Sequence, residues 1–338
     1  MIQSRSIKTR FSLLLLIMKH HSTATLATRQ PLLNTPAGLL WGLLGVLAFS
    51  FTVPMTRIAV ANEGMDPIFV GAGRAVIAAI LAAIALWTAK QERPNTSQWL
   101  RLSVVAFGVV LGFPLLTSFA MASVPANHGA VVIAILPAAT AVAAVIRTKE
   151  RTKASFWCAA AIGALAAIVF AVISGGGLAG LQPADLLLLA AVVVCGIGYA
   201  EGGLLARELG AWQTISWALV LASPLMLVLS LISLHHQAPS SGPAGWGAFA
   251  YLGFVSMYLG FVAWYRGLAI GPMSRVSQVQ LVQPVLTILW AALLLGENIG
   301  WSTIAGGAVV ICCALLAIRS RATSASTDTS DTMAASAK

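Results

Sequence analysis

The chain has 338 residues, of which 59% are hydrophobic and only 9% are charged, and its formal net charge is +10 at pH 7. Its mean hydropathy is +0.89, so it has too few polar side chains to cover a water-soluble globule of this length. The composition therefore excludes a soluble globular protein and predicts an integral membrane protein.

Ten apolar segments follow one another along the chain, each about as long as the roughly 20 residues that a helix needs to cross a bilayer. The loops between them are short, so we expect no inserted soluble domain. The sequence predicts an all-α integral membrane protein with ten transmembrane helices. These begin at about Ala37, Pro67, Arg101, Ala126, Ala154, Ala184, Trp212, Trp246, Arg275 and Trp301.

Positively charged residues gather on one side of the ten predicted spans. That side holds both chain ends and the loops after the second and fourth spans, whereas the opposite loops offer only Arg57, near a span end, beside Glu63 and Asp66. Because cytoplasmic loops of membrane proteins collect Lys and Arg, both termini are predicted to be cytoplasmic. The net charge of +10 then needs no nucleic-acid partner.

An internal repeat appears when the chain is aligned with itself at an offset of 147 positions. Five landmark pairs then coincide without a gap, which indicates duplication. Each half contains five spans, an odd number, so the second half must enter the membrane the other way up. Two inverted five-helix repeats are typical of secondary transporters that work by alternating access. The pairs are Pro36 with Pro183, Trp99 with Trp246, Pro125 with Pro272, Pro137 with Pro284, and Glu150 with Glu297.

The repeat divides the chain into four parts. Residues 1–36 form an N-terminal tail without any acid, which we expect to be a cytoplasmic extension, with a transit peptide as the alternative. Residues 37–175 form the first five-helix repeat and residues 184–320 the second. Residues 321–338 are polar and low in complexity, so we expect a disordered cytoplasmic tail.

Two prolines lie near the middle of matching spans, Pro137 in the fourth and Pro284 in the ninth. Proline removes one backbone N–H and frees the carbonyl four residues earlier. In hydrocarbon that carbonyl needs a partner, so each kink should face protein or a wet cavity. A plain structural kink is the alternative, but the correspondence between the two halves favours a cavity.

The ninth span also carries polar side chains, which are costly in a membrane unless they are hydrogen-bonded. Ser277 and Gln280 share a helix face with the proline of that span, and Gln283 lies just beside this face. We therefore predict that Ser277, Gln280 and Gln283 bind substrate or ion. Tyr199 and Trp264 are further candidates, although aromatic residues more often pack or lie at the membrane interface.

Several of these features resemble the drug/metabolite transporter superfamily, specifically two tandem EamA-type domains over roughly residues 36 to 320. The likeness rests on Trp41-Gly42, Arg57, Arg74, the proline-centred fourth and ninth spans, and the acids in TKER and LLLGEN. It implies a ten-helix carrier of the bacterial inner membrane, most often an ion-driven exporter of amino acids or other small metabolites, with a cavity between the halves. Leu188 and Leu221 stand where Trp41 and Arg74 would repeat, so those two roles are not symmetric.

Two charged residues lie well inside the predicted spans. Glu201 lies about 9 Å inside the cytoplasmic end of the sixth span, and Arg74 about 10 Å from the external end of the second, at roughly 1.5 Å per residue. Glu201 either faces the cytoplasmic half of the cavity, taking up a proton or holding a cationic group, or is hydrogen-bonded to a neighbouring helix. Arg74 either snorkels outward along its stem or contacts substrate. Their difference in depth argues against a direct ion pair.

The paired acids Glu150 and Glu297 lie in short loops just before a helix. We expect both to be structural, because a carboxylate there favours the positive N-terminal ends of the fifth and tenth spans and can accept backbone N–H bonds.

We expect an exporter of a small polar metabolite such as an amino acid, coupled to an ion that is predicted to be a proton. A multidrug or cationic-compound efflux carrier, with Glu201 as the counter-charge, is an alternative, and metabolite uptake is another. An intramembrane enzyme is disfavoured because the chain has no H-E-x-x-H, no G-x-S-x-G and no His/Cys cluster with ligand spacing. The expected partners are the substrate, the coupling ion and the lipid bilayer, with no cofactor or metal, and we expect a monomer or homodimer.

Overall fold

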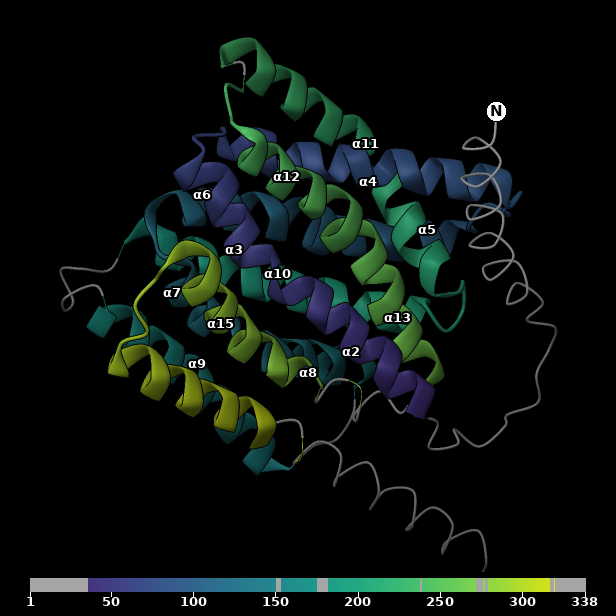
Figure 1. Cartoon of the computed structure of the whole chain (residues 1–338). Helices are drawn as coiled ribbons and strands as arrows, with labels where there is room; N and C mark the ends of the chain where they lie inside the picture. Colours follow the sequence, from purple (N-terminus) through teal and green to yellow (C-terminus); the bar gives the residue numbers. More distant parts are fainter. Residues whose placement is uncertain are drawn as a thin grey trace, which may run out of the picture.

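The computed structural model describes residues 36–149, 153–174, 182–237, 239–271, 276, 279–316 and 319, and the regular structure of these residues is helical throughout. It contains 7 helices that are long and apolar enough to cross a membrane. Three shorter apolar helices, Ala154–Phe170, Gln280–Leu295 and Trp301–Leu316, occupy the remaining predicted positions. The helices form one bundle (Figure 1), so the predicted all-α membrane fold with ten spans is confirmed.

The first half consists of five spans, several of which are interrupted. Its elements are α2 (Pro36–Ser50), α3 (Thr52–Arg57) and η1 (Ile58–Asn62) in the first span, α4 (Pro67–Thr88) in the second, α5 (Thr96–Val105), η2 (Ala106–Gly112) and α6 (Phe113–Ser123) in the third, α7 (Ala126–Ile133) and α8 (Leu136–Thr148) in the fourth, and α9 (Ala154–Ser174) in the fifth.

The second half follows the same plan. Its elements are α10 (Pro183–Leu205), α11 (Ala211–His236), α12 (Pro243–Tyr251), η4 (Leu252–Leu259), α13 (Gly260–Ile270), η5 (Gln280–Val282), α15 (Gln283–Leu295) and a final helix, Trp301–Leu316.

Irregular helical turns recur at matching positions of the two halves. The π-helical turns η2 and η4 both interrupt a third span, and such turns often mark functional sites. The fourth spans restart at Leu136 and at Gln283, each directly before its proline. These two residues are 147 positions apart, the offset of the repeat, so the duplicated sequence produces duplicated breaks.

Contacts between helix ends show that the two halves are inverted. The start of α10 lies beside the start of α7, because Oδ1 of Asp185 and Nε2 of His128 are 2.7 Å apart. The end of α10 lies beside the start of α5, where Glu201 contacts Arg101. The sixth span therefore runs opposite to the third. Since the third span is parallel to the first in a chain that crosses back and forth, the first spans of the two halves also run in opposite directions.

The central helices belong to both halves and are closely packed. α2 packs against α13, and α10, which corresponds to α2 in the repeat, packs against η2 and α6. Glycine makes both approaches possible: a Cβ atom added at Gly38 would lie 2.7 Å from the Cα atom of Gly271, and one added at Gly108 would overlap the backbone carbonyl of Val194. These two places are called the glycine seams below.

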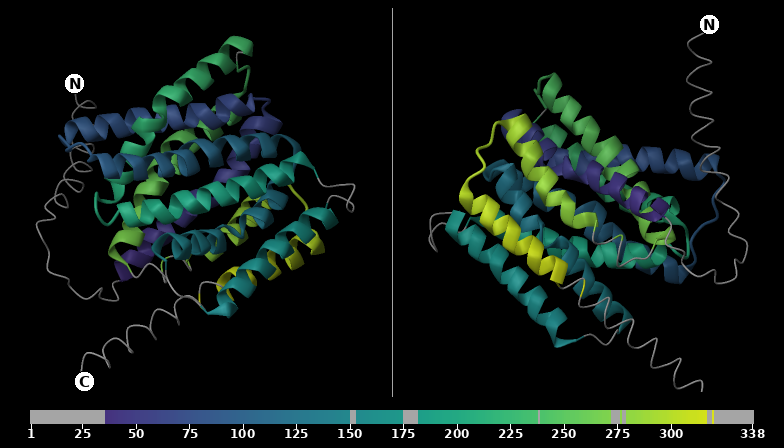
Figure 2. Two further views of the ribbon diagram at one scale, coloured as in Figure 1. Left: turned by 180° about the vertical axis from the view of Figure 1, so that it is seen from behind. Right: turned by 60° about the horizontal axis from the view of Figure 1, so that its bottom comes forward.

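The edge of the bundle is apolar, as a lipid-facing surface requires. α9 and the final helix lie side by side along one edge (Figure 2), with Gly163 of the first against Cys313 of the second. Large hydrophobic side chains, including Leu40 and Leu293, are exposed on the outer faces. This surface agrees with a multi-pass membrane protein. The predicted tails, residues 1–36 and 321–338, lie outside the described residues except for Pro36.

Candidate functional site

Two adjoining cavities lie in the middle of the bundle, where helices from both halves are interrupted. The first has about 290 Å³ of empty space and lies between the broken fourth and ninth spans. Both prolines line it, together with both predicted glutamines. Its lining residues are Val53, Ala130, Ile133, Ala134, Leu136, Pro137, Gln280, Gln283, Pro284 and Thr287.

The second cavity has about 410 Å³ of empty space and shares Val53, Leu136 and Gln283 with the first. Little of the space in either cavity is wide enough for a water molecule, so neither has room for a metabolite in the described conformation. Its other lining residues are Phe49, Thr52, Arg74, Val109, Phe113, Pro114, Tyr199, Ser256, Met257 and Phe261.

Arg74 reaches the second cavity from α4, and its relative exposure is only 1%. One of its terminal nitrogens, Nη2, donates to Oγ1 of Thr117 at 3.3 Å, while Nε has no hydrogen-bond partner in the described residues. Of the two alternatives for Arg74, outward snorkelling is therefore wrong. The side chain points into the bundle instead, where it lines the mainly apolar second cavity.

The two glutamines of the ninth span face the cavities with unsatisfied polar atoms. Gln280 and Gln283 are both buried, and Nε2 of the first and Oε1 of the second have no hydrogen-bond partner among the described residues. Buried polar atoms without partners are rare in folded proteins. Gln283 lines both cavities and so links them. Ser277, predicted to share this role, lies outside the described residues.

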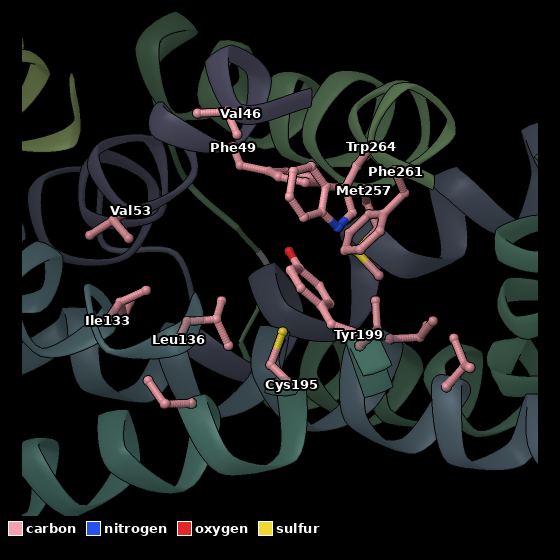
Figure 3. Packing of buried hydrophobic residues seen from close by; sticks show 14 of the residues in the cluster. Val46, Phe49, Val53, Ile133, Leu136, Cys195, Tyr199, Met257, Phe261 and Trp264 are labelled. Atoms are coloured by element: carbon pink, nitrogen blue, oxygen red, sulfur yellow. The ribbon is translucent and has the colours of Figure 1, made fainter. Parts of the chain in front are cut away.

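The two predicted aromatic residues lie in one cluster, and only Tyr199 lines a cavity. The Tyr199 ring extends from α10 towards Phe49, Phe261 and Trp264 (Figure 3), with its centroid 6.4 Å from that of Phe49 and 6.1 Å from that of Trp264. The Trp264 side chain is 1% exposed, and the backbone of Trp264 closely approaches Gly45 in the first span. Trp264 therefore contacts the Tyr199 ring without lining a cavity itself.

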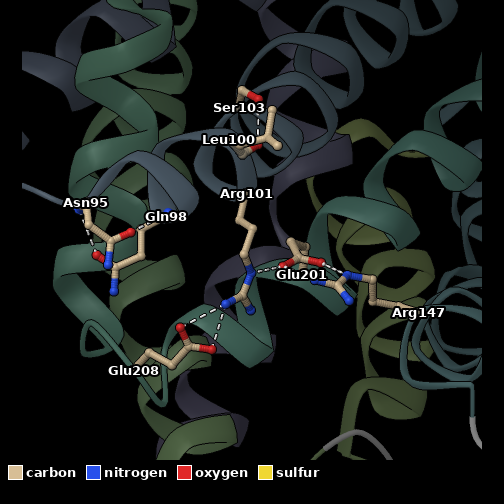
Figure 4. A network of polar contacts seen from close by, with 8 residues as sticks. All are labelled: Asn95, Gln98, Leu100, Arg101, Ser103, Arg147, Glu201 and Glu208. Atoms are coloured by element: carbon tan, nitrogen blue, oxygen red, sulfur yellow. Dashed lines mark hydrogen bonds and ion pairs between the residues drawn. The ribbon is translucent and has the colours of Figure 1, made fainter.

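Glu201 takes part in a separate group of four charges, which we call the α10 charge cluster: Arg101, Arg147, Glu201 and Glu208. Oε1 of Glu201 accepts from Nε of Arg101, and its Oε2 accepts from Nε of Arg147 at 2.6 Å. Arg101 also donates through Nη1 to both oxygens of Glu208, at 2.6 and 2.8 Å. Figure 4 shows the two arginines on opposite sides of the Glu201 carboxylate.

The α10 charge cluster changes the interpretation of Glu201. The residue does not line either cavity. Its carboxylate, with a side-chain exposure of 5%, is held by arginines from α5 and α8. The structure thus favours the alternative in which neighbouring helices hold Glu201. Although Arg101 and Arg147 were placed at the same membrane side as the end of α10, the sequence did not reveal that they approach this carboxylate.

Four other acids make contacts at the end of the bundle opposite to the α10 charge cluster. Glu297 accepts the backbone N–H groups of Ala126 and Asn127 at 2.7 and 2.8 Å, at the start of α7. We expected Glu297 to serve the helix that follows it, and that expectation is wrong because its loop reaches across to the first half. Glu150 lies outside the described residues. Asp66, Glu63 and Asp185 likewise make contacts with Ser233, Gly242 and His128.

Comparison with known proteins bears directly on this architecture. Residues 36–172 and 182–319 each match the EamA-like transporter family. The chain belongs to that family. It is 46% identical over 286 residues to "Uncharacterized transporter YdeK" of Bacillus subtilis (strain 168), with 85% of this chain and 98% of that protein covered.

A solved structure titled only "Crystal structure of protein" superposes with a TM-score of 0.58, at 17% identity, over 84% of this chain and 98% of that one. At that identity the likeness supports the fold alone. The two family matches begin and end close to the predicted repeats, so this EamA-like transporter has two tandem domains that fit a ten-helix, inverted-repeat fold.

Proposed function

We propose that this EamA-like transporter exports a small polar metabolite, such as an amino acid, by alternating access in a bacterial inner membrane, driven by an ion gradient, with a proton as the coupling ion. Both termini would then be cytoplasmic, as the distribution of Lys and Arg predicts. The two inverted halves support the transport mechanism, because inverted repeats exchange conformations around a site near the bilayer midplane.

One observation carries the polar nature of the substrate. Arg74, Gln280 and Gln283 bring unsatisfied polar atoms to two adjoining cavities that both halves build. A site lined mainly by apolar groups, with a few convergent polar groups, is the usual form of a small-molecule site. A polar metabolite would supply the hydrogen bonds that these side chains lack.

The cationic-compound alternative has less support. Such a carrier needs a carboxylate that faces the substrate, and no carboxylate lines either cavity in the described part of the chain. Glu201, the candidate for that role, already faces two arginines. Uptake would use the same site, so direction has to be measured.

The test compares metabolites in the medium of cells that produce the wild type, Glu201→Gln or no transporter, with the two proteins at matched membrane levels. We expect one or a few small polar compounds to be enriched with the wild type, and a protonophore to abolish the enrichment. Enrichment that is equal with Glu201→Gln would assign Glu201 to the scaffold. Depletion of a compound from the medium would indicate uptake, and resistance to lipophilic cations without any metabolite change would indicate drug efflux.

A further inference from the structure

The charge of Arg74 is not balanced by any acid among the described residues around it. Its guanidinium carries five N–H donors, yet its one hydrogen bond in the described structure goes to the hydroxyl of Thr117. That hydroxyl is neutral and itself donates to the carbonyl of Phe113 at 2.6 Å. Within the described part of the chain, Arg74 is therefore a buried cation that contacts a dipole and no anion.

The acids of the described chain are all engaged elsewhere or exposed. Glu92 is exposed in the loop between α4 and α5. The others bind backbone amides or cationic and hydroxyl side chains at the two ends of the bundle, away from the cavities. These are Glu63 with Gly242, Asp66 with Ser233, Asp185 with His128, Glu201 and Glu208 with Arg101, and Glu297 with Ala126.

A buried charge without a partner is strongly unfavourable, and a charged residue at membrane depth normally faces a partner or a substrate path. Arg74 lines the second cavity together with Gln283 and with Thr52 and Ser256, whose hydroxyls are hydrogen-bonded to each other at 2.7 Å, which leaves one hydroxyl proton of this pair for a ligand. A guanidinium matches the geometry of a carboxylate or phosphate better than any other side chain does.

We infer that the transported metabolite carries an oxyanion, a carboxylate or a phosphate, that binds the guanidinium of Arg74 inside the second cavity. This inference rests on the proposed function. It excludes neutral and purely cationic compounds as substrates. It also assigns to Arg74 a role that Leu221, the corresponding residue of the second repeat, cannot share.

The first test repeats the medium comparison with Arg74→Gln, Arg74→Lys and, as a matched control, Arg93→Gln, which removes an exposed loop arginine. The compounds enriched with the wild type should carry a carboxylate or phosphate. Arg74→Gln should lower their enrichment at least about 10-fold, the equivalent of one lost charge-assisted hydrogen bond. Arg74→Lys should retain part of it, and Arg93→Gln all of it.

An enriched compound without an oxyanion, or unchanged enrichment with Arg74→Gln, would overturn the inference while the proposed exporter stands. No enriched compound with any protein would instead contradict the proposed function. A second measurement then tests the anion site. It records the thermal unfolding of the purified protein in the presence of each proteinogenic amino acid, of the carboxamide of that amino acid, or of inorganic phosphate.

In that second measurement a ligand that binds the folded state raises the melting temperature. An amino acid or phosphate should stabilise the wild type, the matching carboxamide should not, and Arg74→Gln should lose the response. Stabilisation by a carboxamide equal to that by its amino acid, or the absence of any stabilisation, would count against an oxyanion site at Arg74.

Discussion

Glu201 and Arg74 are both charged, both almost fully buried and both inside membrane-spanning helices, yet their surroundings differ. Glu201 lies between two arginines, and one of these binds a second acid. Among the described residues, the Arg74 guanidinium donates one hydrogen bond, to the hydroxyl of Thr117, and its Nε has no partner. A charge that the protein itself neutralises joins helices together, whereas a charge left without a counter-ion beside a cavity is available to a ligand.

Removing an arginine from the α10 charge cluster should have the largest effect. Arg101→Ala leaves Glu208 without this partner and Glu201 with only Arg147, so we expect a loss of about 3 kcal/mol of stability, as for other broken buried pairs. Thermal unfolding in detergent measures the change. Arg147→Ala should cost less, because the Arg147 side chain is 51% exposed and water can replace part of its interaction. Equal losses for the two variants would contradict this ranking.

Removing the charge of Arg74 should act in the opposite direction. Arg74→Met keeps most of the volume and removes a buried, unpaired cation, so we expect the ligand-free protein to gain about 1 to 2 kcal/mol of stability. Thermal unfolding without added ligand measures this gain, and export by cells that produce Arg74→Met should fall in the medium comparison. A protein destabilised by Arg74→Met would mean that Arg74 holds the helices together as Glu201 does.

The smallest effect should come from the opposite side of the bundle. Glu297→Gln weakens the acceptor at the start of α7, and caps of this kind contribute about 1 kcal/mol. The amide oxygen still accepts one of the two N–H bonds, so we expect a decrease of less than about 1 kcal/mol by thermal unfolding. A loss as large as that of Arg101→Ala would show that this contact carries far more than helix capping.

Much of the fold could be predicted because its signals are local or periodic. Apolar length located the ten spans, and the constant offset between Pro137 and Pro284 located the matching helix breaks. The same breaks explain why Gln280 and Gln283 reach a cavity. Arg74 was a candidate from its type and depth alone, but its burial and its lack of a counter-ion required the structure.

The partners of the charged residues could not be predicted, because they come from distant parts of the chain. Glu201 meets Arg101 and Arg147, which are 100 and 54 residues away. Glu297 accepts backbone N–H bonds from the start of a helix that begins 171 residues earlier. The alternation of the spans predicted that Glu201 and Glu297 lie at opposite ends of the bundle, and only helix packing decides which neighbour each of them meets.

The glycine seams constrain how the bundle can change shape. At Gly38 and Gly108 two backbones meet with no side chain between them that could change its rotamer. Each seam joins a helix of one half to a helix of the other, α2 with α13 and η2 with α10. We therefore expect the two helices of each seam to stay in contact and move together, so the rigid bodies of this molecule would be helix pairs drawn from both gene duplicates and not the duplicates themselves.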